Sequence, residues 1–439
     1  MDCAFHLERP WPFEDLGPGC QFQKSQFPEF APDLIGFDGK TWCPFHLPTA
    51  SADDHPSPKA DWNGKQVGEF NEAIFAFIDK AKAEDRTADL TGVVFPGDIA
   101  FYRYQDETSA LPPISFVRAQ FSGDAWFYKA RFSSPARFSE VRFSGFAFFE
   151  KAQFSDTAYF EKAQFNRAAQ FAEAQFSGHA VFNDAQFRGD ADFSGAPSAG
   201  NGGDDGEARG LGDRFHFAIF TGARFGGGAR FTNRRFLEKT DFRGAIFSTA
   251  PEFHNCILHQ DTVFPGEENF QDRSGKAAPA YRTLKLAMEQ LRARDEEAMF
   301  HALELECRRK HPDTPLSVKV FSLLYEWAAD YGRSFMRPLC RLLGFYGVFF
   351  LIYLAAFTSN PVPWDIPITW DIAAGVGRFT VAQVVRPFSA LTLTEGVTVG
   401  SESVEVSLGL ACLAAIQSVL SLGLIALFIL ALRRRFRMG

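Results

Sequence analysis

The chain has 439 residues and a formal net charge of −8, and it contains 51 Phe against 9 Tyr and 7 Trp. This length is enough for two or three domains. The small acidic surplus argues against a nucleic-acid-binding chain, for which a basic surplus is typical, so we expect no nucleic acid among the partners. Heavy use of one aromatic residue indicates an internal repeat, because an ordinary core mixes several apolar types.

The N-terminal segment, residues 1–60, is rich in cysteine and histidine. A Cys-x-Phe-His pattern occurs twice and a third cysteine lies between the copies, which gives the candidate ligands Cys3, His6, Cys20, Cys43 and His46. Thiolates and imidazoles are the ligands that tetrahedral zinc prefers. The chain opens without an apolar run, so we expect no secretory signal and no disulfides. Four of these five residues are predicted to bind zinc; the alternative is free thiols in a loosely folded, Pro-rich terminus.

Residues 61–87 are predicted to form a helix. Apolar residues recur there at helical spacing, at Phe70, Ala73, Ile74, Phe77 and Ile78. The helix directly precedes the repeat described next. We expect it to cap the first coil, since the open backbone edge of a repeat structure needs a cover.

A ladder of phenylalanines occupies residues 88–266. Between Phe116 and Phe193, Phe recurs at alternating intervals of five and six residues, and from Phe121 on the residue two places before each Phe is Ala, with Val141 as the exception. Neither a helix nor an alternating strand would place these positions on one face. A solenoid does, because each unit forms one side of a coil, with Phe and the small Ala pointing to the axis. Successive Phe rings then stack from coil to coil.

The tandem Ala-x-Phe-x-x pattern resembles the pentapeptide-repeat family in its Phe-centred form. The resemblance implies a β-solenoid, a right-handed quadrilateral β-helix with four sides and 22 residues to a coil. The 28 ladder positions would make about seven coils and a rod of roughly 34 Å. Residues 196–213 read as a flexible loop that takes the place of most of one coil, and the ladder resumes at Phe215.

Residues 267–338 are predicted to be a helical connector with a juxtamembrane helix. Apolar spacing within 279–310 indicates two helices broken near Arg294 and Asp295, which would cap the far end of the solenoid. Residues 330–338 resemble the juxtamembrane sequence of a subset of bacterial pentapeptide-repeat proteins that end in a two-span hairpin. That subset brings no settled biochemical activity with it.

Residues 339–439 are predicted to form a transmembrane hairpin with an external loop at 359–405. The stretches 342–358 and 406–432 carry no charge, and the second is about 40 Å long as a helix, ample for a hydrocarbon core of about 30 Å. Arginines precede the first stretch and follow the second. The positive-inside rule then predicts a multi-pass protein of the bacterial inner (plasma) membrane with both termini in the cytoplasm.

The sequence favours a scaffold over an enzyme. It contains no Walker motif, nucleophile elbow or His-Glu-x-x-His motif, so we expect no catalytic residues and no cofactor besides zinc. The favoured function is a membrane-anchored scaffold whose rigid cytoplasmic solenoid binds a protein partner. The alternative is an oligomeric two-span channel or pore gated by the solenoid, with 377–390 as a short pore helix, although no selectivity-filter motif is present. The expected partners are the lipid bilayer, another protein and further copies of this chain.

Overall fold

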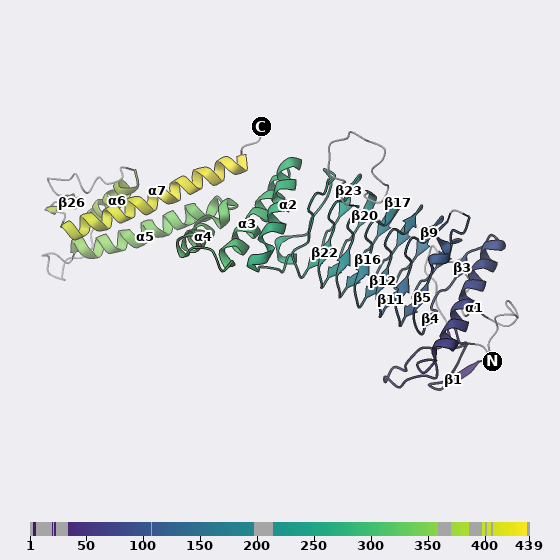
Figure 1. The fold of residues 1–439 in the computed structure, drawn as a ribbon. Helices are drawn as coiled ribbons and strands as arrows, with labels where there is room; N and C mark the ends of the chain where they lie inside the picture. The colour runs from purple at the N-terminus through teal and green to yellow at the C-terminus, as the bar shows by residue number, and fades with distance from the viewer. Residues whose placement is uncertain are drawn as a thin grey trace, which may run out of the picture. The chain divides into compact units, whose positions relative to one another are not determined.

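The structure, a computed structural model (Figure 1), forms two compact units, Met1–Glu297 and Ala298–Gly439. The residues that it describes are 3–5, 20, 22, 34–106, 108–196, 214–358, 370–385, 397–399, 402–404 and 407–436. All of the predicted loop at 196–213 except residue 196, and most of the predicted external loop at 359–405, therefore lie outside the described residues.

The first unit is built on a β-solenoid whose short parallel strands stack in four columns (Figure 1). The first column consists of β3 (Ala88–Asp89), β6 (Ile114–Ser115), β10 (Ala136–Arg137), β14 (Ala158–Tyr159), the end of β17 (Gln175–Val181), the end of β20 (Arg214–Ile219) and β24 (Thr240–Asp241). The second consists of β4 (Val94–Phe95), β7 (Gln120–Phe121), β11 (Arg142–Phe143), β15 (Gln164–Phe165), β18 (Gln186–Phe187), β21 (Arg224–Phe225) and β25 (Ile246–Phe247).

The other two columns complete the four sides. The third consists of β5 (Ile99–Ala100), β8 (Ala125–Trp126), β12 (Ala147–Phe148), β16 (Ala169–Gln170), β19 (Ala191–Asp192) and β22 (Ala229–Arg230). The fourth consists of β9 (Arg131–Phe132), β13 (Gln153–Phe154), the starts of β17 and β20, and β23 (Arg235–Phe236). Because β17 and β20 turn a corner, they join the first and fourth columns into one sheet.

The register confirms the predicted β-solenoid. Ala136 pairs with Ala158 and Phe143 with Phe165, each 22 residues further along the chain. The rings of Phe143 and Phe165 stack with centroids 5.0 Å apart, and the ladder phenylalanines are buried. In the described residues the seven strands of the first column span six full turns, against about seven coils predicted.

The alternation of five and six residues comes from two kinds of corner. On the five-residue sides one residue adopts a left-handed conformation. It is charged between Phe116 and Phe187, as are Arg118 and Glu140 with φ of 56° and 58°, and it is Gly or Asn in the later coils. The amide of Ala119 donates to the carbonyl of Phe116, which closes a type II turn with the left-handed residue at its third position. Arg118 and Glu140 are one coil apart and form an ion pair of 2.8 Å, so the corners are also linked along the solenoid.

Helices cover both ends of the solenoid, as predicted. At one end α1 (Gly64–Ala83) begins with a capping box at Asn63, and its Phe70 packs edge-on against Phe95 of the first coil. At the other end Phe270 stacks on Phe247 and receives the edge of Tyr281 from α2 (Ala278–Leu291). The remaining elements of this unit are the hairpin β1 (Ile35–Phe37) and β2 (Lys40–Trp42) and the 3₁₀ turns η1 (Tyr102–Tyr104), η3 (Glu267–Asn269) and η4 (Gly275–Ala277).

The insertion after residue 196 corrects one prediction. Phe176 stacks on Phe215 and Phe193 stacks on Phe231, so the ladder continues from one coil directly to the next. The paired residues Ala180 and Ala218 are 38 positions apart. The inserted residues therefore lengthen one coil, and the prediction that they replace most of a coil is wrong.

The second unit contains the two predicted apolar helices. It begins within α3 (Arg294–Lys310), whose start agrees with the predicted break near Arg294. The elements that follow are α4 (Leu316–Ala329), η5 (Asp330–Gly332), α5 (Met336–Thr358), α6 (Trp370–Val385), the hairpin of β26 (Val397–Val399) and β27 (Glu402–Val404), and α7 (Leu408–Phe436). Two stretches, Met336–Phe357 and Leu408–Arg433, are long and apolar enough to cross a membrane. They pack against each other, and α6 packs against both.

Candidate metal centre

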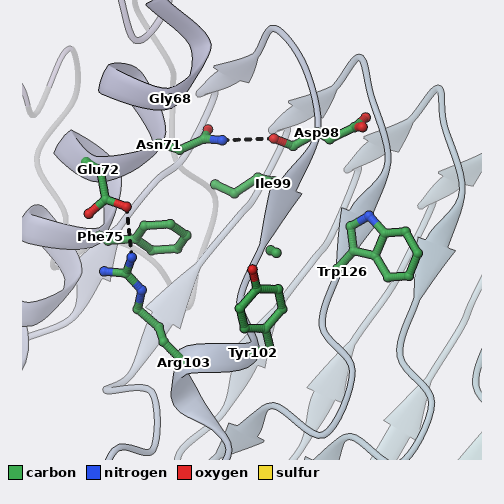
Figure 2. Close-up of a pocket in the computed structure, with 10 residues that line it drawn as sticks. Gly68, Asn71, Glu72, Phe75, Asp98, Ile99, Tyr102, Arg103 and Trp126 are labelled. Atoms are coloured by element: carbon green, nitrogen blue, oxygen red, sulfur yellow. Dashed lines mark hydrogen bonds and ion pairs between the residues drawn. The ribbon is translucent and has the colours of Figure 1, made fainter. Parts of the chain in front are cut away.

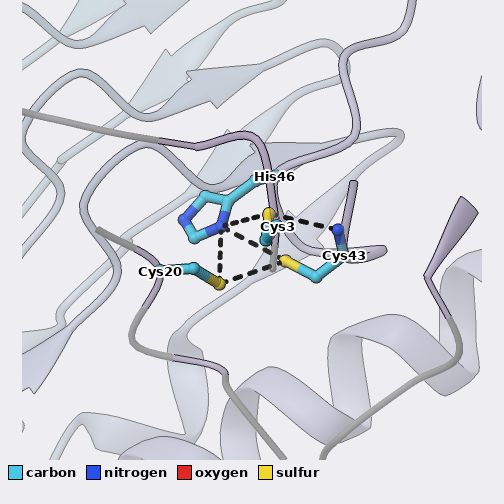
Figure 3. Close-up of side chains that lie close together, drawn as sticks. All are labelled: Cys3, Cys20, Cys43 and His46. Carbon is cyan, nitrogen blue, oxygen red and sulfur yellow. Dashed lines mark hydrogen bonds between the residues drawn. The ribbon is translucent and has the colours of Figure 1, made fainter. Parts of the chain in front are cut away.

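Three cysteines and one histidine of the N-terminal segment converge on one point (Figure 3). The Nδ1 atom of His46 lies 3.2 Å from Sγ of Cys43, 3.3 Å from Sγ of Cys20 and 3.9 Å from Sγ of Cys3. All four ligand atoms lie within 4.8 Å of one another. Ligand atoms around a tetrahedral ion with bonds of about 2.0–2.3 Å are separated by roughly 3.3–3.8 Å. The cluster therefore has the size of a four-ligand metal site.

Local backbone structure brings these side chains together. After β2 the chain makes a tight turn in which the amides of His46 and Leu47 both donate to the carbonyl of Cys43. This turn places Cys43 and His46 on the same side, as the three-residue spacing predicts. The amide of Ala4 donates to the carbonyl of Thr41, and the amide of Cys43 donates to Sγ of Cys3 at 3.2 Å.

The imidazole of His46 is oriented from the other side. Its Nε2 lies 3.1 Å from the carbonyl oxygen of Thr91, which can only accept a hydrogen bond, so Nε2 carries the proton. The lone pair is then on Nδ1, which faces the three sulfur atoms. The ring of Phe5 stacks on the imidazole with centroids 3.9 Å apart. A hydrogen bond from the ring nitrogen that does not bind the metal, like that from Nε2 to Thr91, is the usual way in which a metal-binding histidine is held.

The three thiols shift one another's pKa. Hydrogen bonds from Cys20 and then from Cys43 lower the pKa of Cys3. The hydrogen bond with Cys3 raises the pKa of Cys20 to about 12, and the hydrogen bond with Cys20 raises the pKa of Cys43. Cys20 and Cys43 are buried. Three thiolates at this separation repel one another unless a cation lies between them, which is what a bound metal ion supplies.

A buried lysine lies beside the cluster. The ammonium group of Lys59 donates to the carbonyls of Pro44 and Phe45, and it lies 4.5 Å from the ring centre of Phe70. Burial lowers its pKa to about 7, whereas the nearby Cys43 thiolate acts in the opposite direction. Three thiolates around a divalent ion carry a net charge of −1, so the charged form of Lys59 would balance the site.

Part of the solenoid matches a known family of repeats. Residues 116–164 and 160–201 match the family model described as Pentapeptide repeats (9 copies). This part of the chain is made of pentapeptide repeats. No curated protein matches the chain, and no solved structure matches it. The pentapeptide-repeat solenoid is a structural repeat fold, and the metal cluster lies outside the matched residues.

The structure brings together four of the five predicted ligands. Cys3, Cys20, Cys43 and His46 form the cluster, and His6 lies outside the described residues. Two supporting groups were missed. Thr91 contributes a backbone carbonyl, for which a sequence holds no signal. Lys59 is the one Lys or Arg of residues 41–64, and this isolation is the signal that could have singled it out.

The first unit also has a hollow of about 560 Å³ (Figure 2). It lies between α1, β5, η1 and β8. Arg103 bridges its wall through an ion pair of 2.9 Å with Glu72 and lies over the ring of Phe75. Two aromatic side chains at the hollow are exposed, Tyr102 by 61% and Trp126 by 39%. Exposed aromatic rings at a hollow are typical of a binding surface.

Proposed function

We propose that this protein is a membrane-anchored scaffold that presents its pentapeptide-repeat solenoid to a protein partner in the cytoplasm. The observation that carries the proposal is the exposure of two apolar helices. Only 11% of the apolar stretch of α5 and 28% of that of α7 are buried. In water so much apolar helix surface would be unfavourable, and the hydrocarbon core of a bilayer is the environment that suits it.

The proposed orientation rests on charge. Arg337 and Arg341 lie in the first turns of α5, and Arg433 is the last residue of the apolar stretch of α7. The positive-inside rule places both of these ends in the cytoplasm. The solenoid precedes α5 and would therefore be cytoplasmic too. The membrane that holds the apolar helices would be the inner membrane of a bacterium.

For the metal cluster we propose zinc with a structural role. The donor set is three thiolates and one imidazole, a combination typical of structural zinc, and four protein ligands leave no open position for catalysis. Metal analysis of the purified chain tests this directly. One zinc per chain in the wild type and well below one in the Cys43→Ser variant is the expected result. Equal, substoichiometric zinc in both would remove the assignment.

The proposed partner surface is the side of the solenoid that carries Trp126. Its ring stacks on Phe148 of the next coil at 4.0 Å, so an aromatic surface extends along the solenoid from the hollow. A photo-crosslinking residue in place of Trp126 is expected to capture one defined protein in membranes, and the same residue in place of Leu237, 40% exposed on another column, is expected to capture none. Identical products from both positions would contradict the surface.

One observation favours a pore as the second candidate. Buried polar contacts link the two apolar helices and α6: Tyr353 of α5 donates to Gln417 of α7 at 2.9 Å, and Gln417 donates to the carbonyl of Thr380 in α6 at 3.1 Å. Polar groups within the membrane mark functional sites more often than chance. Reconstitution in a planar bilayer separates the candidates. The scaffold predicts no conductance, and reproducible unitary currents would favour the pore.

A further inference from the structure

Helix α4 exposes its apolar side chains, whereas an ordinary surface helix buries them. Its exposed large apolar side chains are between 44% and 77% exposed, and they are Leu316, Val318, Val320, Phe321, Leu323, Leu324 and Trp327. The spacing of Leu316, Val320, Leu323 and Trp327 places these four on one face of the helix. A contiguous apolar surface of this kind is unusual in a soluble protein.

The polar side of α4 is the side that the chain itself covers. Glu326 forms an ion pair with Arg309 of α3, and the hydroxyl groups of Ser322 and Tyr331 are 3.1 Å apart. The ring of Tyr331 also meets that of Tyr325 edge-on. The polar face is thus held within the unit, and the apolar face is left to the surroundings.

The apolar face continues the surface of the first span. Trp327 lies 6.0 Å from Phe345 of α5, and the guanidinium of Arg341 lies 4.7 Å from the ring centre of Trp327. The helix has 14 residues, about 21 Å, which is too short to cross a hydrocarbon core of about 30 Å. An exposed apolar helix that is too short to span, with Trp327 near its end and Arg341 of α5 against that ring, fits the membrane–water interface.

We propose that α4 lies in the cytoplasmic membrane–water interface and that Arg337 and Arg341 beside it bind the phosphate of anionic phospholipids. This inference rests on the proposed membrane anchor. Trp327 would sit at the depth of the headgroups, and Phe321 and Leu324 would enter the outer acyl region. Arg337 is half exposed, although it also contacts Asp330 at 3.2 Å, and Arg341 is exposed. Both can therefore reach a headgroup from the start of α5.

The experiment uses the full chain in vesicles of phosphatidylcholine and phosphatidylglycerol that carry brominated acyl chains. The signal of Trp327 is the difference in tryptophan fluorescence between the wild type and Trp327→Phe. We expect bromine near the headgroups to quench this difference at least about twofold more than bromine near the bilayer centre. The Phe321→Glu, Leu324→Glu double variant is expected to lose that quenching, and Leu237→Glu on the solenoid is expected to keep it. Replacing phosphatidylglycerol with phosphatidylcholine, or Arg341 with Gln, is expected to weaken it.

Three results would overturn the inference. If Trp327 is not quenched although the chain stays in the vesicles after an alkaline carbonate wash, α4 does not lie in the interface and the proposed anchor still holds. Protection of Trp327 together with cross-linking between chains would assign the apolar face to a second copy. Quenching that ignores lipid charge would remove the phosphate contact. Release of the whole chain by carbonate would instead contradict the proposed anchor.

Discussion

His46 donates its Nε2–H to the carbonyl of Thr91 across 3.1 Å, and Thr91 follows the first strand of the solenoid. The hydroxyl of Thr91 lies 2.9 Å from that of Ser115 in the next coil, and the amide of Val94 donates to the carbonyl of Phe45. The Cys/His cluster is therefore joined to the open edge of the first coil, where a solenoid needs protection from pairing with other chains.

Metal removal is predicted to loosen this end of the solenoid and leave the middle unchanged. Because a structural metal contributes its binding energy to folding, chelation should speed hydrogen exchange of the Val94 amide by at least about tenfold. The amide of Gln164, which donates to the carbonyl of Val141 in the middle coils, should not change. The Cys256→Ser variant is the control for loss of a thiol elsewhere: its Val94 amide should exchange as in the wild type, because Cys256 lies outside the cluster. Unchanged exchange at Val94 after metal loss would contradict the structural role.

Replacement of Arg234 is predicted to destabilise the solenoid strongly. This arginine is fully buried at a position where the repeat has Ala, and its guanidinium donates to the carbonyls of Phe171, Ala174 and Phe193. Arg234→Ala leaves these buried carbonyls without that donor and opens a cavity, at a cost of roughly 3–5 kcal/mol in the free energy of unfolding. Urea denaturation measures the loss. The matched control is Arg224→Ala at an exposed position, with an expected change below about 0.5 kcal/mol.

The ladder phenylalanines are predicted to be the core. Phe154 is 1% exposed and stacks between Phe132 and Phe176. Phe154→Ala should lower the free energy of unfolding by roughly 3–5 kcal/mol through the lost burial and the cavity that remains. Thermal melting followed by circular dichroism checks this. A melting shift no larger than that of the exposed Arg142→Ala variant would argue against the axial position.

Tyr353 and Gln417 are predicted to act as a coupled pair in the second unit. Each of the variants Tyr353→Phe and Gln417→Leu removes their hydrogen bond, so the effects on thermal stability in detergent should not add. The expected coupling is about 0.5–1.5 kcal/mol, the range for hydrogen bonds between membrane helices. Val419→Ala on the exposed side of α7 serves as the partner-free control, because it should add to Tyr353→Phe without coupling. Full additivity of the first pair would show that the bond contributes nothing.

The sequence predicted the solenoid because its core repeats. One inward Phe on each side is enough to reveal the period, and the alternation of five and six residues also reports the two corner types. Arg234 was missed for a physical reason. An arginine breaks the rule that inward positions hold small or aromatic residues, and only the three-dimensional position of the carbonyls of Phe171 and Ala174 shows why it fits.

The Cys/His cluster and the second unit were predicted in part. The residue types named a four-ligand site, but the choice of Cys20 depends on the path of the chain between Cys3 and Cys43, which spacing alone cannot fix. The two long apolar helices were evident from their length and lack of charge. The outward face of α4 was not, because a pattern of apolar residues at helical spacing predicts a buried face, and the contact of Glu326 with Arg309 decides which side faces out.

Protease protection in oriented membranes tests the central claim most directly. One sample of membranes that hold the full chain is washed with alkaline carbonate, which tests anchoring. Separate, sealed samples are treated with protease, either as right-side-out spheroplasts or as inside-out vesicles, which tests sidedness. A cytoplasmic, membrane-anchored solenoid predicts that the unit Met1–Glu297 stays with the membrane through the wash, survives protease in spheroplasts and is cut in inside-out vesicles. Release of the chain by carbonate, or loss of that unit in intact spheroplasts, would contradict the account.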